Sequence, residues 1–150
     1  GIDHDSVTTR LLEPNGFIAA IQETYANKAA CDVVKFDFDR DNNDRMYFTN
    51  LSLDDSPSDS SNESNVRGAI QKLIWKLWGE SVDANHEQVT TAYNLIKEVH
   101  ETGSADNSKT DRIDCSTDNG RIRRDDFDYV ERSWNLLVTY VLADFKFLYE

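Results

Sequence analysis

The sequence has few of the residues that mark common catalytic and cofactor sites. Its two cysteines, Cys31 and Cys115, form no Cys-x-x-Cys or Cys-x-x-Cys-His motif, which argues against zinc, attached haem and dithiol redox chemistry. Its six glycines form neither Gly-x-Gly-x-x-Gly nor Gly-x-x-x-x-Gly-Lys, so the usual nucleotide phosphate cradles are missing. With only three histidines, and no serine in a Gly-x-Ser-x-Gly frame, the sequence indicates no nucleophilic catalytic site.

Long apolar runs and an excess of basic charge are also missing. The longest uncharged stretch of apolar character, Ser133 to Ala143, has eleven positions, so no membrane insertion is expected. With 16 basic against 28 acidic residues, the net charge of −12 disfavours nucleic acid and favours cations or basic partners. The start has neither an initiator Met nor a signal-like pattern, so we expect a processed chain or a fragment.

The strongest pattern that is present is a long amphipathic helix from Asp125 to Glu150. Apolar residues recur there at steps of three and four, which places them on one stripe: Phe127, Val130, Trp134, Leu137, Val141, Phe145 and Leu148. Polar residues, among them Arg132, Asn135 and Thr139, are expected opposite the stripe. Asp125 and Asp126 would begin this helix at its positive dipole end.

Three further helices are expected near residues 14–30, 65–78 and 84–102. Gly79 and Gly103 are expected to end the second and third of them. The chain should therefore form a mainly α, four-helix domain with long loops, in which residues 1–150 make one unit. The predicted core combines residues from all four helices: Ile21, Leu73, Leu77, Ile96, Trp134, Leu137, Val141 and Phe145.

Between the first two helices the pattern changes twice. From Val33 to Leu53, apolar residues alternate with polar ones on both sides of an acidic turn, which is typical of a short β-hairpin. From Asp54 to Asn65 a Ser, Asp, Asn and Glu run contains only Pro57 as a rigid residue, a composition ordinarily found in linkers. We expect this run either to be fastened to the body of the protein or to be held by another molecule.

The two cysteines favour a disulfide between Cys31 and Cys115. Each one adjoins an aspartate in a segment that flanks a helix, outside the apolar stripes, and two buried thiols are the alternative. A disulfide implies a periplasmic or extracellular location.

One segment has the composition of a calcium site. Oxygen-bearing side chains recur there at alternate positions: Asp37, Asp39, Asp41 and Asn43. This resembles the opening of an EF-hand loop, but Asn42 replaces the glycine of the sixth position and Phe48 replaces the bidentate Glu of the twelfth. Calcium is the one cofactor to test, and an ordinary Asp/Asn turn is the alternative. No other cofactor is expected.

Two stretches resemble helical segments of uncharacterised exported bacterial proteins, of the planctomycete and myxobacterial domain-of-unknown-function type. They are Ile70–Glu80 (IQKLIWKLWGE) and Tyr140–Glu150 (YVLADFKFLYE). Such domains can accompany cytochrome c modules, but without Cys-x-x-Cys-His the resemblance implies no haem here. It implies an exported module of a larger assembly and carries over no catalytic residue.

Three functions remain open at this point. The first is a non-enzymatic, extracytoplasmic interaction module with a protein partner or a homo-oligomeric state, whose acidic contacts would be Asp54, Asp55, Asp59 and Glu63. The second is an acidic helical inhibitor that covers a basic partner, as immunity proteins do. The third is a hydrolase with paired carboxylates, which would need acids of raised pKa in a deep pocket.

Overall fold

The structure, a computed structural model, describes residues 16–105, 126 and 129–143. These residues form four α-helices and two short 3-10 turns, and no strand occurs among them. The elements are α1 (Gly16–Phe38), η2 (Asn42–Asp44), η3 (Ser60–Asn62), α2 (Glu63–Trp78), α3 (Glu87–Ala105) and α4 (Val130–Ala143). The predicted mainly α, four-helix architecture is confirmed, and no described helix is both long and apolar enough to cross a membrane.

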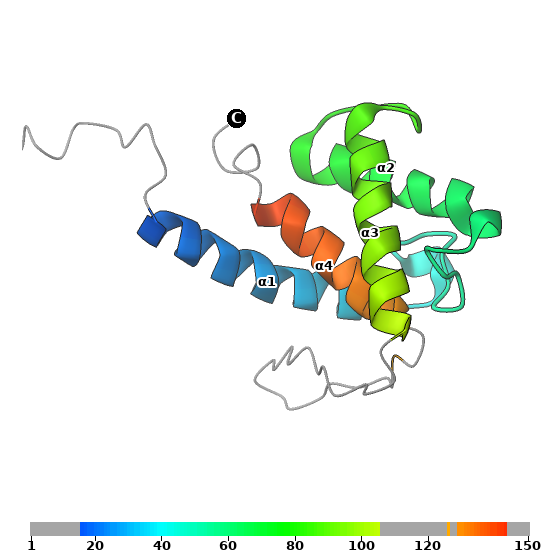
Figure 1. Cartoon of the computed structure of the whole chain (residues 1–150), viewed down its shortest axis with the longest axis horizontal. Helices are drawn as coiled ribbons and strands as arrows, with labels where there is room; N and C mark the ends of the chain where they lie inside the picture. Colours follow the sequence, from blue (N-terminus) through cyan, green and yellow to red (C-terminus); the bar gives the residue numbers. More distant parts are fainter. Residues whose placement is uncertain (1–15, 106–125, 127–128, 144–150) are drawn as a thin grey trace, which may run out of the picture.

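The first and last of these helices are neighbours. Figure 1 shows α4 (orange to red) lying along α1 (blue), with α3 crossing α4 near its start and α2 passing behind α3. Near one end of the pair, Gln22 Nε2 donates to the carbonyl of Ala143 at 2.6 Å, and further along Asn135 Nδ2 donates to Cys31 Sγ at 3.3 Å. Because residue numbers rise on one helix as they fall on the other, the two helices run antiparallel.

The buried face of α1 differs from the predicted one. The structure buries residues at intervals of four: Ala26, Ala30, Val34 and Phe38. Ile21, which was predicted in the core, is 40% exposed, and Tyr25 one turn later is 70% exposed, so placing Ile21 in the core was wrong. The first helix was predicted to end near residue 30, which left Val34 and Phe38 out of it. Because the helix continues to Phe38, these two residues extend the buried face.

The alternative of a β-hairpin from Val33 to Leu53 was also wrong. Val34, Phe36 and Phe38 alternate in sequence, but they belong to the last turns of α1, where Val34 and Phe38 are buried and Phe36 is 59% exposed. A step of four places residues on the same side of a helix, and a step of two places them on opposite sides. The remainder of the segment consists of η2 and irregular turns.

Helices α2 and α3 bury the faces that their periodicity predicts. The fully buried residues are Val66, Ala69, Ile70, Leu73 and Ile74 of α2, and Val89, Ala92, Tyr93 and Ile96 of α3, together with His100. Leu77 is partly buried against the same core. Helix α2 ends at Gly79 as expected, because Gly79 adopts a left-handed conformation (φ 73°) and its N–H bonds the carbonyl of Trp75 at 3.0 Å.

Arg67 joins α2 to α3 and to the loop between them. Its guanidinium lies 2.7 Å from a Glu63 oxygen, 4.5 Å from the centre of the Tyr93 ring and 3.0 Å from the carbonyl of Ala84. Burial raises the pKa of the Tyr93 phenol; the Glu63 and Glu101 carboxylates add to the rise, and Arg67 opposes it. This arrangement keeps Tyr93 neutral within the interface between the two helices.

Helix α4 supplies the largest side chain of the core, Trp134. The described part of the predicted stripe is buried, and the predicted continuation through Phe145 and Leu148 lies outside the described residues. Asn135, expected on the polar face, is instead buried against α1. At the other end, Asp126 accepts hydrogen bonds from the N–H groups of Glu131 (3.2 Å) and Arg132 (2.9 Å), so it caps the helix.

Gly103 does not end α3, which continues to Ala105. A Cβ at this position would collide with the ring of Tyr129, just before α4. The glycine is therefore required by the close approach of that ring to α3 rather than by helix termination.

Candidate functional site

The predicted calcium ligand Asp37 has a structural role. Its side chain is 1% exposed, and its carboxylate accepts backbone hydrogen bonds from Met46 (2.6 Å), Tyr47 (2.8 Å) and Phe48 (2.8 Å). Three N–H donors replace the water that the buried carboxylate has lost. Asp37 therefore fastens the turn after α1 to the end of that helix.

The structure does not assemble the other predicted ligands around Asp37. The remaining three, Asp39, Asp41 and Asn43, are exposed around the end of α1 and η2. The part of the chain that the structure describes contains no group of three or more His, Cys, Asp or Glu side chains placed to hold a metal ion. Asp37 lies in the last turn of α1 with its carboxylate already satisfied by backbone donors, and calcium binding by these residues stays a prediction.

Arg45 complements Asp37 by binding the carbonyl groups of the same region. Its guanidinium donates to the carbonyls of Arg40 (3.1 Å), Phe38 (3.3 Å) and Leu51. The last carbonyls of a helix have no partner within the helix, so the bond to Phe38 satisfies one of them. Asp37 and Arg45 together hold the backbone of residues 39–53.

This anchoring places Phe48 in the centre of the core. Its ring stacks on Phe38 with centroids 4.7 Å apart and lies 5.0 Å from the ring of Trp134 on α4. Phe48 is fully buried, which explains why an aromatic residue occupies the position where an EF-hand would carry its bidentate Glu.

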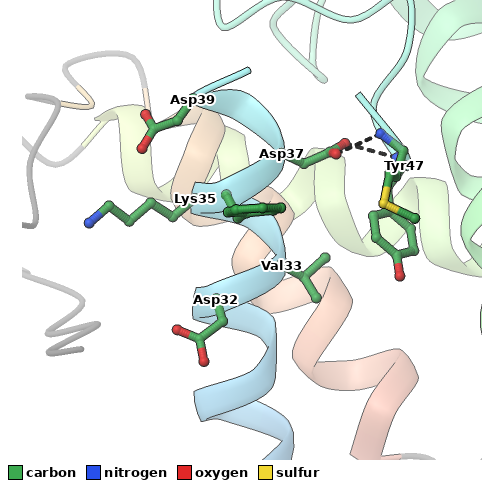
Figure 2. Close-up of a pocket in the computed structure, with 8 residues that line it drawn as sticks. Asp32, Val33, Lys35, Asp37, Asp39 and Tyr47 are labelled. Carbon is green, nitrogen blue, oxygen red and sulfur yellow. Dashed lines mark hydrogen bonds between the residues drawn. The ribbon is translucent and has the colours of Figure 1, made fainter. Parts of the chain in front are cut away.

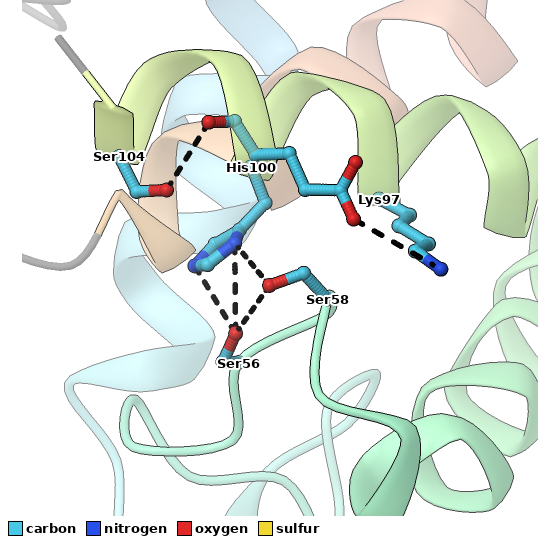
Figure 3. A network of polar contacts seen from close by, with 6 residues as sticks. Ser56, Ser58, Lys97, His100 and Ser104 are labelled. Carbon is cyan, nitrogen blue, oxygen red and sulfur yellow. Dashed lines mark hydrogen bonds and ion pairs between the residues drawn. The ribbon is translucent and has the colours of Figure 1, made fainter.

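The second acidic segment is fastened to the body of the protein. Pro57 is buried, and the hydroxyls of Ser56 and Ser58 meet the buried imidazole of His100 on α3 (Figure 3). Ser58 Oγ lies 3.0 Å from Nδ1 and Ser56 Oγ lies 3.3 Å from Nε2, while the two hydroxyl oxygens are 3.1 Å apart. Of the two explanations for an ordered linker, the structure thus shows fastening by the chain itself.

The four acids predicted to contact a partner lie along this segment in different roles. Asp54 and Asp59 are exposed, and the Asp55 carboxylate accepts from the N–H of Ser52 at 2.6 Å. Glu63 pairs with Arg67. Asp59 caps η3 by accepting from the N–H of Ser61 at 2.8 Å, and this bond, with help from the Ser61 hydroxyl, lowers the pKa of Asp59.

An apolar groove, which sequence reasoning did not reveal, lies between the last turns of α1 and the anchored turn. Its apolar lining consists of Val33, Phe36, Met46 and Tyr47, with Asp32, Lys35, Asp37 and Asp39 completing the set. The cavity volume is about 540 Å³. Figure 2 shows Val33 and Tyr47 turned toward the same space, with Asp37 reaching across to the backbone of the turn. We refer to this feature as the apolar groove.

Lys76 of α2 lies near the groove. Lys76 Nζ lies 5.9 Å from the centre of the Tyr47 ring and 5.6 Å from that of Trp75, so the cation lies between two aromatic rings. Trp75 is 56% exposed, and Met46 is 47% exposed. Lys76 thus lies near both Tyr47 of the groove lining and the exposed ring of Trp75.

The structure describes only one of the two cysteines of the predicted disulfide. Cys31 is buried on α1, where it accepts a hydrogen bond from Asn135. Cys115 lies outside the described residues, so a disulfide between the two stays a prediction.

Comparison of the chain with protein-family models, with curated protein sequences and with solved structures finds no match. The resemblance of Ile70–Glu80 and Tyr140–Glu150 to exported bacterial proteins therefore stays a prediction, and function must be argued from the residues themselves.

Proposed function

We propose that this chain is a non-enzymatic interaction module that binds a basic protein segment through the apolar groove. The single observation that supports this function is the exposure of two large apolar side chains, Phe36 and Met46, in the lining of one groove. Contiguous exposed apolar patches on soluble domains commonly mark interaction sites. Large amphipathic side chains such as Trp and Tyr are also the usual energetic centres of protein interfaces.

We place the proposed contact in the apolar groove rather than in the acidic segment. If the acidic segment needed a partner to become ordered, its acids Asp54, Asp55, Asp59 and Glu63 would be the expected contacts. His100 and local turns already hold this segment in place, so its order does not depend on a partner. Those acids contribute instead to the negative field of the whole chain, which speeds the encounter with a basic partner.

The chemistry of the groove specifies the partner. Val33, Phe36, Met46 and Tyr47 offer space for one large apolar side chain. Asp32 at the margin offers a carboxylate to an adjacent Lys or Arg, and Asp37 cannot do so because its oxygens are used by the backbone. The alternative function, an inhibitor of a basic enzyme, would bind through the same groove and would block the activity of the enzyme.

We place the module in the periplasm or outside the cell, on the basis of the predicted Cys31–Cys115 disulfide. Mass spectrometry of the purified, alkylated protein tests this part. Two alkylated thiols in protein isolated from its native source would reject both the disulfide and the location drawn from it.

The groove is tested by selecting peptides from a displayed random library on the intact chain and measuring their affinity by calorimetry. We expect peptides that carry a large apolar residue next to Lys or Arg. Met46→Asp should weaken their binding by about tenfold or more, since it places a charge in the apolar contact. Affinity should also fall as salt is raised.

Leu136→Asp is the matched control, because Leu136 is an exposed apolar residue on α4 and receives the same new charge. Selected peptides without basic residues, or peptides that bind Met46→Asp as well as the parent chain, would refute the groove as the docking site.

A further inference from the structure

The outward face of α1 carries a second apolar surface, distinct in position from most of the groove. Six exposed residues fall within about 100° of the helix circumference: Ile21, Tyr25, Lys28, Ala29, Asp32 and Phe36. They extend for roughly 22 Å along the axis. We call these six residues the outer stripe.

The outer stripe lies opposite the face that α1 buries in its own protein. Ala30 and Val34 point into the core, half a turn away from Tyr25 and Phe36. Helix α1 is therefore apolar on two sides. A helix of this kind is typical of a buried position, yet only one of its two sides is covered by the described part of the chain.

The positions of the six residues in the outer stripe are symmetric about a point between Lys28 and Ala29. If a second α1 were laid antiparallel across this point, Ile21 would face Phe36 of the second copy, and Tyr25 would face Asp32 of the second copy. Every member of the stripe then meets a member of the same stripe. This is the requirement for the self-complementary interface of a two-fold dimer.

Size and charge in the stripe support the same arrangement. Ala29 is the smallest side chain and lies at the centre, where two helix backbones would come closest. Lys28 would lie within one helical turn of Asp32 of the second copy, close enough for an ion pair, and Tyr25 could donate its hydroxyl to that carboxylate. No ion pair joins Lys28 to Asp32 within the described chain, so both charges are available for this contact.

We infer that the outer stripe is a homodimer interface in which two copies of α1 pack antiparallel. This inference deepens the proposed interaction function and rests on a different surface, sharing only Phe36 and Asp32 with the groove. A single helix face buries less than the about 800 Å² per partner of a standard interface, so we expect a weak dimer with a Kd on the order of 10–100 µM.

Analytical ultracentrifugation of the purified chain, over roughly 10 to 500 µM, tests the inference. We expect the average mass to rise toward that of a dimer across this range. Because each protomer carries a net charge of −12, repulsion between whole protomers should make the dimer stronger as salt is raised. Binding of a basic peptide in the groove should respond to salt in the opposite direction.

Charge reversal gives the decisive comparison. Lys28→Glu leaves only acids at the crossing, and Asp32→Lys leaves only cations there, so each should weaken the dimer by about tenfold or more. The double variant restores the opposite charges and should restore the dimer. Both positions are exposed, so circular dichroism and melting should stay near those of the parent.

Met46→Asp separates this inference from the proposed function, since it should weaken peptide binding by about tenfold or more and leave the dimer unchanged. A monomer throughout the concentration range, or a dimer that the charge reversals leave intact, would overturn the proposed interface.

Discussion

Two neighbouring polar segments, residues 39–53 and residues 54–62, are both fastened to the body of the protein, but by different means. The first is held by a buried carboxylate and a guanidinium, Asp37 and Arg45, that bind backbone groups. The second is held by a buried imidazole, His100, that meets two serine hydroxyls. The first also inserts Phe48 into the core, whereas the second buries only Pro57.

The difference predicts unequal stability. A buried charge left without its partners is costly, and so are backbone amides left without an acceptor. Serine hydroxyls can exchange donor and acceptor roles or turn toward water at lower cost. Residues 39–53 should therefore open only with global unfolding, and residues 54–62 should open locally.

The largest expected effect comes from Asp37→Ala. It leaves three N–H groups without an acceptor and should lower the free energy of unfolding by about 3–5 kcal/mol, measured by urea denaturation. Asp41→Ala is the control, because Asp41 is exposed and makes no side-chain cap bond, and it should change stability by less than about 0.5 kcal/mol. Equal losses in the two variants would contradict the anchoring role of Asp37.

Arg45→Met should have the next largest effect. It removes the donor to the carbonyls of Phe38, Arg40 and Leu51, at a cost of about 1.5–3 kcal/mol by the same measurement. Arg40→Met is the matched control, since the Arg40 guanidinium rests on the exposed ring of Phe36 at 4.0 Å and should contribute about 0.5–1 kcal/mol. A larger loss for Arg40→Met than for Arg45→Met would be inconsistent with this assignment.

Removing both hydroxyls with Ser56→Ala and Ser58→Ala should lower stability by about 1–2 kcal/mol. Hydrogen exchange should become faster for the amides of residues 54–62 and stay unchanged for those of residues 46–48. Ser60→Ala, at an exposed position of η3, is the control. Faster exchange in both segments would show that they open together and would end the contrast between them.

The smallest effect concerns Asp59. Its pKa should lie below 3.8 in an NMR titration of the folded chain, and Ser61→Ala should bring it only part of the way back, since the backbone N–H is the larger cause. Because the folded pKa is lower than the unfolded one, Asp59 stabilises the fold above the unfolded pKa, and this contribution is lost as the pH falls through the folded value. A full return to 3.8 in Ser61→Ala would show that the hydroxyl dominates.

The sequence predicted α2, α3 and the described part of α4 well, because each has one apolar face and one polar face. Helix α1 was harder because it is apolar on two sides, and the more prominent stripe, with Ile21 and Tyr25, is the one that remains exposed. Small residues at Ala26 and Ala30 make the buried face, and burial of alanine gives a weak signal in sequence. The buried Asn135 was missed for a related reason, since its partner Cys31 lies 104 positions away.

The candidate sites were harder to predict than the helices. Asp37 has the residue type and spacing of a calcium ligand. Only the fold shows that its carboxylate accepts hydrogen bonds from three backbone N–H groups. The partners of His100 lie 42 and 44 positions away, and no local pattern relates them. The groove combines α1 with a turn whose position depends on those same anchors, so its existence could not be read from any one segment.

The antiparallel packing of α1 on α4 has a consequence for synthesis of the chain. Gln22 and Ala143 are 121 positions apart, so α1 leaves the ribosome well before the helix that covers it. At about 5–20 residues per second the delay is roughly 6 to 24 s, far longer than the submicrosecond formation of an isolated helix. During that interval the outer stripe and the face that will meet α4 are both open to water, so α1 offers a chaperone two apolar surfaces before α4 has been made.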